Sequence, residues 1–298
     1  MSGAGPFLDR VPPRLQSHWD IRGALNFMLG GAGAGLLAAI ALATPIAPDV
    51  RALVALGLAL VGAGLFCVWL KIGRPWRAFH VIRRPSTSWM SREAWIAPLI
   101  FACGAYAIVF QARLAVLACS LLGLVYAYAQ ARILKANIGI PAWRRWSCVS
   151  LVFNTALTEG LALLCMAALV WPQFATYGYP LAALLVLRFA AWRFYLDDLR
   201  RTGAPTGTLA AFDAFGPKFV WIGHVAAGVC AAAGTWSGQA ILVAAGGLLA
   251  LIGGALFKYT LVCRAAFTQG FALPRSPSRG KGKPGAGAQP GWQAGKAS

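Results

Sequence analysis

"ALNFMLGGAGAGLLAAIALAT", residues 24–44, decides the fold class. This run contains no charged side chain and is long enough to cross a bilayer as a helix. Similar runs recur along the chain of 298 residues, of which 59% are hydrophobic and only 12% are charged. A soluble domain carries about 25% charged residues. The sequence therefore predicts an all-α polytopic membrane protein, folded as a bundle of about eight transmembrane helices.

The predicted spans are separated by short connections. They cover residues 24–44, 51–70, 94–110, 113–131, 148–171, 178–196, 217–235 and 239–262. A segment at residues 1–22 precedes the membrane domain, 23–262, and the tail at 263–298 is rich in Gly, Pro and Ser, a composition typical of disordered chain. Within the first span, Gly31 and Gly35 have the spacing that lets a second helix approach closely in lipid.

The net charge of +19 raises the question of nucleic-acid binding. The basic residues, however, are concentrated near the termini and in alternate connections at 71–93, 132–147 and 197–216. This is the pattern of the positive-inside rule, which predicts that both termini lie in the cytoplasm. A nucleic-acid binder would need a basic face on a soluble fold. The predicted partner is thus the lipid bilayer, and no nucleic acid is expected.

The metal-binding residue types are sparse and scattered. None of the seven cysteines form a C-x-x-C pair, whereas zinc and iron–sulfur sites need thiolates at short spacing. Of three histidines, only His224 lies within a predicted span, and a haem in a helical bundle usually needs a histidine on each of two facing spans. The sequence predicts no metal, haem or iron–sulfur cluster in this chain.

The connection "KIGRPWRAFHVIRRPSTSWMSREAW", residues 71–95, combines basic and aromatic side chains. Pro75 suits a first helical position, and Trp76, Phe79 and Ile82 follow one another at steps of three on one side. We therefore expect a short helix at the membrane interface, with its apolar side toward lipid. The basic residues that would anchor it are Arg74, Arg77, Arg83 and Arg84.

Membrane anchoring does not explain the polar residues at the two ends of this connection. Ser91 is placed to cap the third span, which would put Glu93 in its first helical turn. Glu93 is the only acid of the loop, and Lys71 lies at the other lip. A carboxylate and an ammonium group at the mouth of a bundle can hydrogen-bond a quinone head group and exchange its protons. The predicted quinone site comprises Glu93, Lys71, Arg92, Trp89 and Ser91, and Glu93 and Lys71 are the catalytic candidates.

Glu159 lies about midway along the fifth predicted span and also needs an account, because ionisable groups within a membrane are costly. It shares a polar stripe with Asn154, Thr155 and Thr158. One interpretation is a neutral side chain hydrogen-bonded between helices. The other is a proton relay or a quinone-pocket group. Arg188, in the sixth span, could join Glu159 along the substrate or proton path of a transporter.

"GRPWRAF", residues 73–79, and "TSWMSREAW", residues 87–95, resemble the membrane-anchor, quinol-reactive subunits of dimethyl-sulfoxide-reductase-type molybdoenzymes. The start "WDIRGALNFMLGGAGAGLL", residues 19–37, is compatible with that family. The resemblance implies a subunit of a bacterial or archaeal inner membrane, active in anaerobic respiration. It would exchange electrons between menaquinone or ubiquinone and a four-cluster ferredoxin-like iron–sulfur subunit, which serves a molybdopterin catalytic subunit.

The resemblance also assigns residues. The quinol-site acid of the family matches Glu93, whereas Lys71 stands where many members have a histidine. Lysine can donate to a quinone oxygen but needs desolvation to act as a base near neutral pH. The four loop arginines would dock the iron–sulfur partner. A fainter similarity is to the subgroup that accompanies phenylacetyl-CoA acceptor oxidoreductases.

Two other functions fit the same sequence. A transporter would use Glu159 and Arg188 to line its path, and its helices would show repeat symmetry. A purely structural anchor would hold its partners at the membrane while the quinone chemistry takes place elsewhere. Neither alternative requires Lys71 and Glu93 to lie at one cavity.

Overall fold

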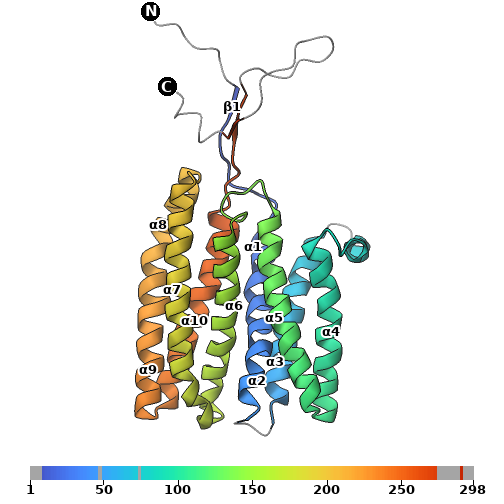
Figure 1. Cartoon of the computed structure of the whole chain (residues 1–298), viewed down its shortest axis with the longest axis vertical. Coiled ribbons are helices and arrows are strands. Elements are labelled where there is room, and N and C mark those ends of the chain that lie inside the picture. The colour runs from blue at the N-terminus through green and yellow to red at the C-terminus, as the bar shows by residue number, and fades with distance from the viewer. Residues whose placement is uncertain (1–8, 46–48, 73–74, 274–288, 291–298) are drawn as a thin grey trace, which may run out of the picture.

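The structure is a computed structural model that describes residues 9–45, 49–72, 75–273 and 289–290. Within these residues, eight helical segments are long and apolar enough to cross a membrane, which confirms the predicted bundle. Figure 1 shows them running side by side along the long axis of the molecule. The predicted fold class is therefore correct.

The first four spans are formed by residues 21–136. The first consists of α1 (Ile21–Leu25), η1 (Asn26–Gly30) and α2 (Gly31–Ala43), the second of α3 (Arg51–Trp69), the third of α4 (Trp89–Phe110) and the fourth of α5 (Arg113–Ala136). A 3-10 helix, η2 (Pro75–Arg83), connects the second span to the third.

The last four spans are interrupted more often by 3-10 and π turns. The fifth consists of α6 (Trp146–Met166) with η3 (Ala167–Leu169), the sixth of η4 (Pro172–Tyr177) with α7 (Gly178–Arg201), the seventh of α8 (Thr206–Val220), η5 (Trp221–Ala226) and α9 (Ala227–Ser237), and the eighth of α10 (Ala240–Tyr259) with η6 (Thr260–Arg264). The segments η1, η5 and η6 are π-helical.

Three short strands lie beyond the end of the bundle at which α1 begins (Figure 1). They are β1 (Asp9–Val11), β2 (Phe271–Leu273) and β3 (Gln289–Pro290), which pair antiparallel in the order β1-β2-β3. The segments that precede α1 and follow η6 therefore leave the bundle at the same end, as an even number of spans requires.

The seventh helical segment begins earlier than predicted. It starts at Thr206 rather than at residue 217, so much of the predicted connection 197–216 is helical. Phe212 is fully buried in this added part, and Asp213 pairs with Arg200 of α7 at 2.9 Å. Asp213 and the interior proline Pro217 lower the hydropathy of this stretch. The start of the helix was therefore missed, because the spans were predicted from hydropathy.

Glycines allow the closest helix contacts. A Cβ atom on Gly35 of α2 would collide with the carbonyl oxygen of Ala156 in α6, and one on Gly160 of α6 would collide with the backbone of Gly35. The prediction that Gly35 lets a helix approach closely is confirmed. Gly31 lies instead against a side chain, Lys258 of α10. In lipid, such backbone proximity and van der Waals packing replace much of the hydrophobic driving force.

The third span begins earlier than predicted. Ser88 has extended backbone and caps α4, since its Oγ accepts a hydrogen bond from the backbone N–H of Ser91 at 3.3 Å. The prediction that Ser91 caps this span is therefore wrong. Glu93 consequently lies beyond the first turn and is buried, with 7% of its surface exposed.

The short helix predicted at Pro75 is present as η2. Its 3-10 geometry has three residues per turn, which places side chains three positions apart on one side. Trp76 is 81% exposed and Ile82 is 41% exposed, so two of the three predicted apolar side chains lie on the surface of the molecule. Their contact with lipid stays a prediction, and the side chain of Phe79 lies outside the described residues.

Candidate quinone pocket

A cavity of about 1110 Å³ opens at the end of the bundle at which α1 begins. Its wall combines residues from the start of the first span, the end of α3, η2, the start of α4 and the end of α5. Small-molecule sites commonly measure about 300–1,000 Å³ and are mostly apolar, with a few polar groups. The aromatic residues of the wall are Trp19, Phe66, Trp69 and Trp89, and the polar ones include His18, Asn26, Lys71, Glu93 and Asn137.

Glu93 supplies the carboxyl group of this wall. Gln130 of α5 donates from Nε2 to Glu93 Oε1 at 3.1 Å and to the backbone oxygen of Asn26 at 3.1 Å. Among the residues that the structure describes, no lysine or arginine lies within ion-pairing distance of this carboxyl group. Glu93 is thus a buried acid whose described hydrogen-bond donor is a neutral amide.

Two further polar atoms beside Glu93 are unsatisfied. The side chains of Asn26 and Tyr126 lie next to its carboxyl group, yet Asn26 Oδ1 and the Tyr126 hydroxyl are buried without a hydrogen-bond partner among the described residues. Buried polar atoms in proteins are nearly always hydrogen-bonded, to protein or to water. This group of atoms therefore has the capacity to bind water or a polar ligand group.

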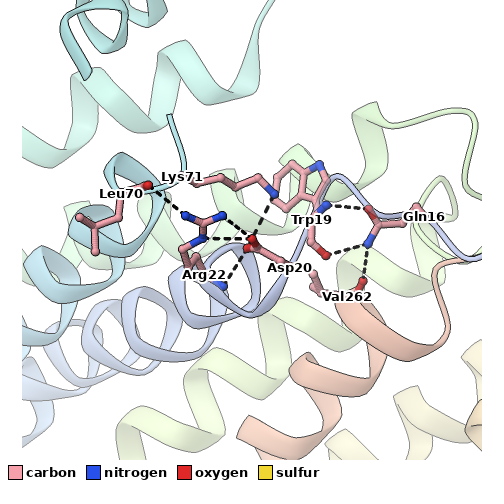
Figure 2. Close-up of polar contacts among 7 residues, drawn as sticks. All are labelled: Gln16, Trp19, Asp20, Arg22, Leu70, Lys71 and Val262. Atoms are coloured by element: carbon pink, nitrogen blue, oxygen red, sulfur yellow. Dashed lines mark hydrogen bonds and ion pairs between the residues drawn. The ribbon is translucent and has the colours of Figure 1, made fainter. Parts of the chain in front are cut away.

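Lys71 supplies the positive charge of the cavity wall. Its Nζ lies 3.8 Å from Asp20 Oδ1, and the same Asp20 carboxylate accepts hydrogen bonds from Arg22, the shortest at 2.7 Å (Figure 2). Arg22 also donates to the backbone oxygen of Leu70 at 3.1 Å, which joins the start of the first span to the end of the second. Asp20 thus positions both cations.

The Lys71 ammonium group retains hydrogen-bonding capacity. It is buried and makes an ion pair, but it donates no hydrogen bond within the described part of the chain. Asp20 keeps its charge, because the Arg22 side chain, aided by the charge of Lys71, lowers the pKa of this carboxyl group to about 2. Sequence reasoning missed Asp20 in this role. Its signal was an aspartate directly before an apolar run, which is a preferred N-cap position.

A hydrogen-bonded turn in the N-terminal segment fixes Trp19 at the cavity. Gln16 donates from Nε2 to the backbone oxygens of Trp19, at 2.8 Å, and Val262, at 2.9 Å, and its Oε1 accepts from the Trp19 N–H at 2.6 Å (Figure 2). The Trp19 ring stacks on Phe27 with ring centroids 5.5 Å apart. This part of the wall therefore depends on contacts between the segment before the first span and the end of the last span.

The other predicted quinone-site residues fall into two groups, those that line the cavity and those that do not. Trp89 lines the cavity, and the guanidinium groups of Arg92 and Arg132 lie 4.1 and 4.3 Å from its ring. Arg92 and Ser91 do not line the cavity. Arg92 donates to two backbone oxygens in the turn at residues 85–86, both at 2.7 Å, and Ser91 donates to the backbone oxygen of Val81. Ser91 thus holds η2 against α4, and Arg92 holds the turn that follows η2.

Two of the predicted docking arginines, Arg83 and Arg84, lie at the same end as the cavity. Arg83 and Arg84 are exposed, at the end of η2 and just after it. Arg77 lies within η2, but its side chain is outside the described residues, and Arg74 is outside them altogether. Two of the four arginines are thus available at the surface.

Glu159 does not line the cavity but forms an ion pair with Lys258 of α10, and both side chains are 1% exposed. Glu159 thus contacts a second helix, as the first interpretation required, but through an ion pair with a lysine rather than as a neutral side chain, and its role as a proton relay stays a prediction. Sequence reasoning missed Lys258. Its signal was a lone lysine inside the last apolar run, which by itself is compatible with a side chain that reaches out to the interface.

Arg188 is fully buried and bound to the seventh span. It donates to the backbone oxygen of Gly223 at 2.6 Å and to His224 Nε2 at 3.2 Å. The other ring nitrogen of His224 lies 2.7 Å from the backbone oxygen of Phe219. The π turn η5 contains both Gly223 and His224, and such turns free carbonyl groups from the regular helical pattern. Both nitrogens of His224 are therefore engaged.

Within the described part of the chain, no group of three or more His, Cys, Asp or Glu side chains could hold a metal ion. The model of the family described as DMSO reductase anchor subunit (DmsC) matches residues 32–196, which is more than half of the chain. The match contains Lys71, Trp89 and Glu93, and it ends before Lys258. No curated protein matches the chain.

Proposed function

Because the chain belongs to the DMSO reductase anchor subunit (DmsC) family, we propose that it is the quinone-reactive membrane subunit of an oxidoreductase. In this proposal the cavity at the start of the bundle binds the head group of a quinone or quinol. The observation that supports it best is that Glu93 and Lys71, 22 positions apart, line one cavity of about 1110 Å³.

The chemistry of the cavity wall fits a quinone. The aromatic side chains of Trp19 and Trp69 offer flat apolar surfaces to a planar ring, and Phe66 and Trp89 extend the wall. The two oxygens of a quinone accept hydrogen bonds, and those of a quinol also donate them. The Lys71 ammonium group has unused donors, and Asn26 Oδ1 is an unused acceptor. A head group can satisfy both.

A bound quinol supplies two electrons and two protons. The carboxylate of Glu93 takes up one of these protons, and the other passes to water at the cavity mouth. Gln130 holds the Glu93 side chain in place through its hydrogen bond to Oε1. Lys71 donates a hydrogen bond to the other end of the head group. Asp20 keeps the ammonium group at the cavity wall, because their charges attract at 3.8 Å.

The electrons pass to or from partner proteins in this proposal. The partners are a four-cluster ferredoxin-like iron–sulfur subunit and a molybdopterin catalytic subunit, in a bacterial or archaeal inner membrane with both termini in the cytoplasm. The iron–sulfur subunit docks at the end of the bundle that carries the cavity, where exposed Arg83 and Arg84 attract an acidic surface. This position keeps the distance from quinone to cluster short.

Equilibrium binding of a short-chain quinone analogue tests the location. Leu65 lines the cavity, so Leu65→Trp fills part of it and should weaken binding about tenfold or more, measured by calorimetry in lipid nanodiscs. Leu121→Trp adds the same ring on α5 at a side chain that is 64% exposed, and it should leave the affinity unchanged. Equal affinities for both variants and the original protein would place the quinone elsewhere.

A further inference from the structure

A line of buried polar side chains continues from the cavity into the second half of the bundle. It begins at Glu93 Oε1, which accepts from Gln130 Nε2 at 3.1 Å. Gln130 is 2% exposed, and its side chain extends from α5 toward the first span. The amide oxygen of the same side chain, Oε1, lies beside Gly31 of α2.

The line of polar side chains passes over the backbone of Gly31, and we call this place the crossing point. A Cβ atom on Gly31 would lie 3.3 Å from Gln130 Oε1 and would collide with Lys258 Nζ. The amide of Gln130 and the ammonium group of Lys258 therefore approach the same small space over the Gly31 backbone. Any larger residue at this position would fill it.

Lys258 carries the line on to Glu159. The two side chains form an ion pair, and Glu159 Oε1, the carboxylate oxygen that does not receive Lys258, is buried without a hydrogen-bond partner among the described residues. Arg188 of α7 is a second buried cation that acts electrostatically on both members of the pair. The unsatisfied atoms of Asn26 and Tyr126 lie at the other end of the line, beside Glu93.

We propose that the Lys258–Glu159 pair is a second proton-exchanging site of this protein, joined to Glu93 by a path that runs through Gln130 and over Gly31. The inference rests on the proposed function, because the cavity provides the protons. Three unsatisfied polar atoms, one at the pair and two beside Glu93, give water molecules the partners they need along the path.

The proton balance is simple. Of the two protons that the quinol loses, Glu93 takes one and becomes a neutral acid, and the other passes to water at the cavity mouth, while the two electrons go to the iron–sulfur partner. Glu93 then passes a proton along the path and returns to its former state. At the far end the carboxylate of Glu159 accepts a proton, and Lys258 keeps its own. Proton uptake by a quinone runs the same steps in reverse.

A pair that served only to hold α10 against α6 would behave differently. It would stabilise the bundle, but its protonation would not respond to events in the cavity, which it does not line. The distinction can therefore be made with a measurement of Glu159 itself rather than with turnover alone.

Infrared difference spectra, recorded on binding of a quinone analogue in nanodiscs, provide that measurement. In the original protein we expect two carboxyl signals. Glu93→Gln should remove both signals, because Glu159 responds only to the proton that Glu93 passes on. The double variant Glu159→Gln, Lys258→Met should remove only the second, without leaving an unpaired buried charge.

The decisive variant is Gly31→Ala, which keeps every ionisable group and pushes the Lys258 ammonium group out of the crossing point. We expect it to lose the Glu159 signal and keep the Glu93 signal. Gly62→Ala is the matched control, because a Cβ atom there meets only Phe101 at 3.4 Å, and it should keep both signals. In the assembled complex, Gly31→Ala should also slow quinol-driven turnover about tenfold and increase its solvent deuterium isotope effect.

The outcomes separate the two proposals. If the analogue binds with unchanged affinity in Gly31→Ala but the Glu159 signal persists, or if the original protein shows no Glu159 signal, the path is refuted and the quinone site stands. If the original protein binds no analogue in the cavity, the proposed function fails first.

Discussion

The ammonium group of Lys258 and the carboxylate of Glu159 form an ion pair inside the bundle, although the two residues are 99 positions apart in the chain. Removing two such charges from water costs several kcal/mol per ion, and their attraction repays this only when both remain. The pair joins α10 to α6, so the last span depends on the fifth.

Separate removal of the two charges should therefore be worse than joint removal. We expect Glu159→Gln to destabilise the protein by about 3–5 kcal/mol, because Lys258 is left as a buried unpaired cation. The double variant with Lys258→Met should recover most of that loss, and thermal unfolding in detergent measures the coupling in a double-mutant cycle. Additive effects would show that the charges do not interact.

Glu93→Gln should preserve assembly and abolish quinone-coupled activity. Glutamine keeps the size of the side chain and can still accept the hydrogen bond from Gln130, but it cannot take up a proton at neutral pH. We expect turnover with a quinol donor to fall about 100-fold or more, while electron transfer from an artificial donor to the partner stays constant. Unchanged quinol turnover would refute the role of Glu93.

Asp20→Asn should weaken quinone-analogue binding several-fold by releasing Lys71. The Arg22 side chain and then the charge of Lys71 lower the pKa of Asp20 from 3.8 to about 2. A carboxyl group with a lowered pKa contributes stability that is fully present above its unfolded pKa and is lost as the pH falls through the folded value. Affinity in the original protein should thus not change between about pH 5 and pH 7 on account of Asp20.

Asp49→Asn is the control for that experiment. Asp49 precedes α3 at the other end of the bundle, its side chain pairs with Arg51 at 2.7 Å, and its pKa is also lowered to about 2 by that hydrogen bond. The substitution removes a comparable exposed ion pair far from the cavity. Calorimetry of analogue binding should show no change. A similar loss in both variants would mean that Asp20 has no specific role.

Gly35→Ala should destabilise the bundle, because the new methyl group would collide with the carbonyl oxygen of Ala156 in α6. Overpacking of this kind costs about 1–3 kcal/mol. Gly62→Ala in α3 meets only ordinary contact, and alanine is favoured over glycine within a helix by about 1 kcal/mol, so it should be neutral or stabilising. Thermal unfolding of both variants checks the opposite signs, and equal effects would contradict the close approach.

The order of the spans and the composition of the site were predictable to different degrees. Long apolar runs predicted eight spans, because each helix that crosses a bilayer must by itself be long and apolar. The capping residue of α4 was predicted at Ser91 and is Ser88, because several serines precede this helix and backbone geometry selects among them. Local sequence alone does not contain that choice.

The residues of the cavity were likewise predictable only in part. Glu93, Lys71 and Trp89 could be proposed from their connection, since an unusual acid and tryptophans stand out in a basic loop. Asn26 and Gln130 could not, because each is an ordinary polar residue within an apolar run until the packing of the first, third and fourth spans brings it to Glu93.

The sequence by itself determined that the described part of this chain has eight helices long and apolar enough to cross a membrane. It also determined that a lysine and an acid lie at the two ends of the second connection. Hydropathy and charge are properties of short stretches, so they survive without a structure. Tertiary structure alone decided that Asp20 holds Lys71, that Gln130 holds Glu93 and that Lys258 pairs with Glu159. Each of these contacts joins different spans, and only helix packing sets which side chains meet.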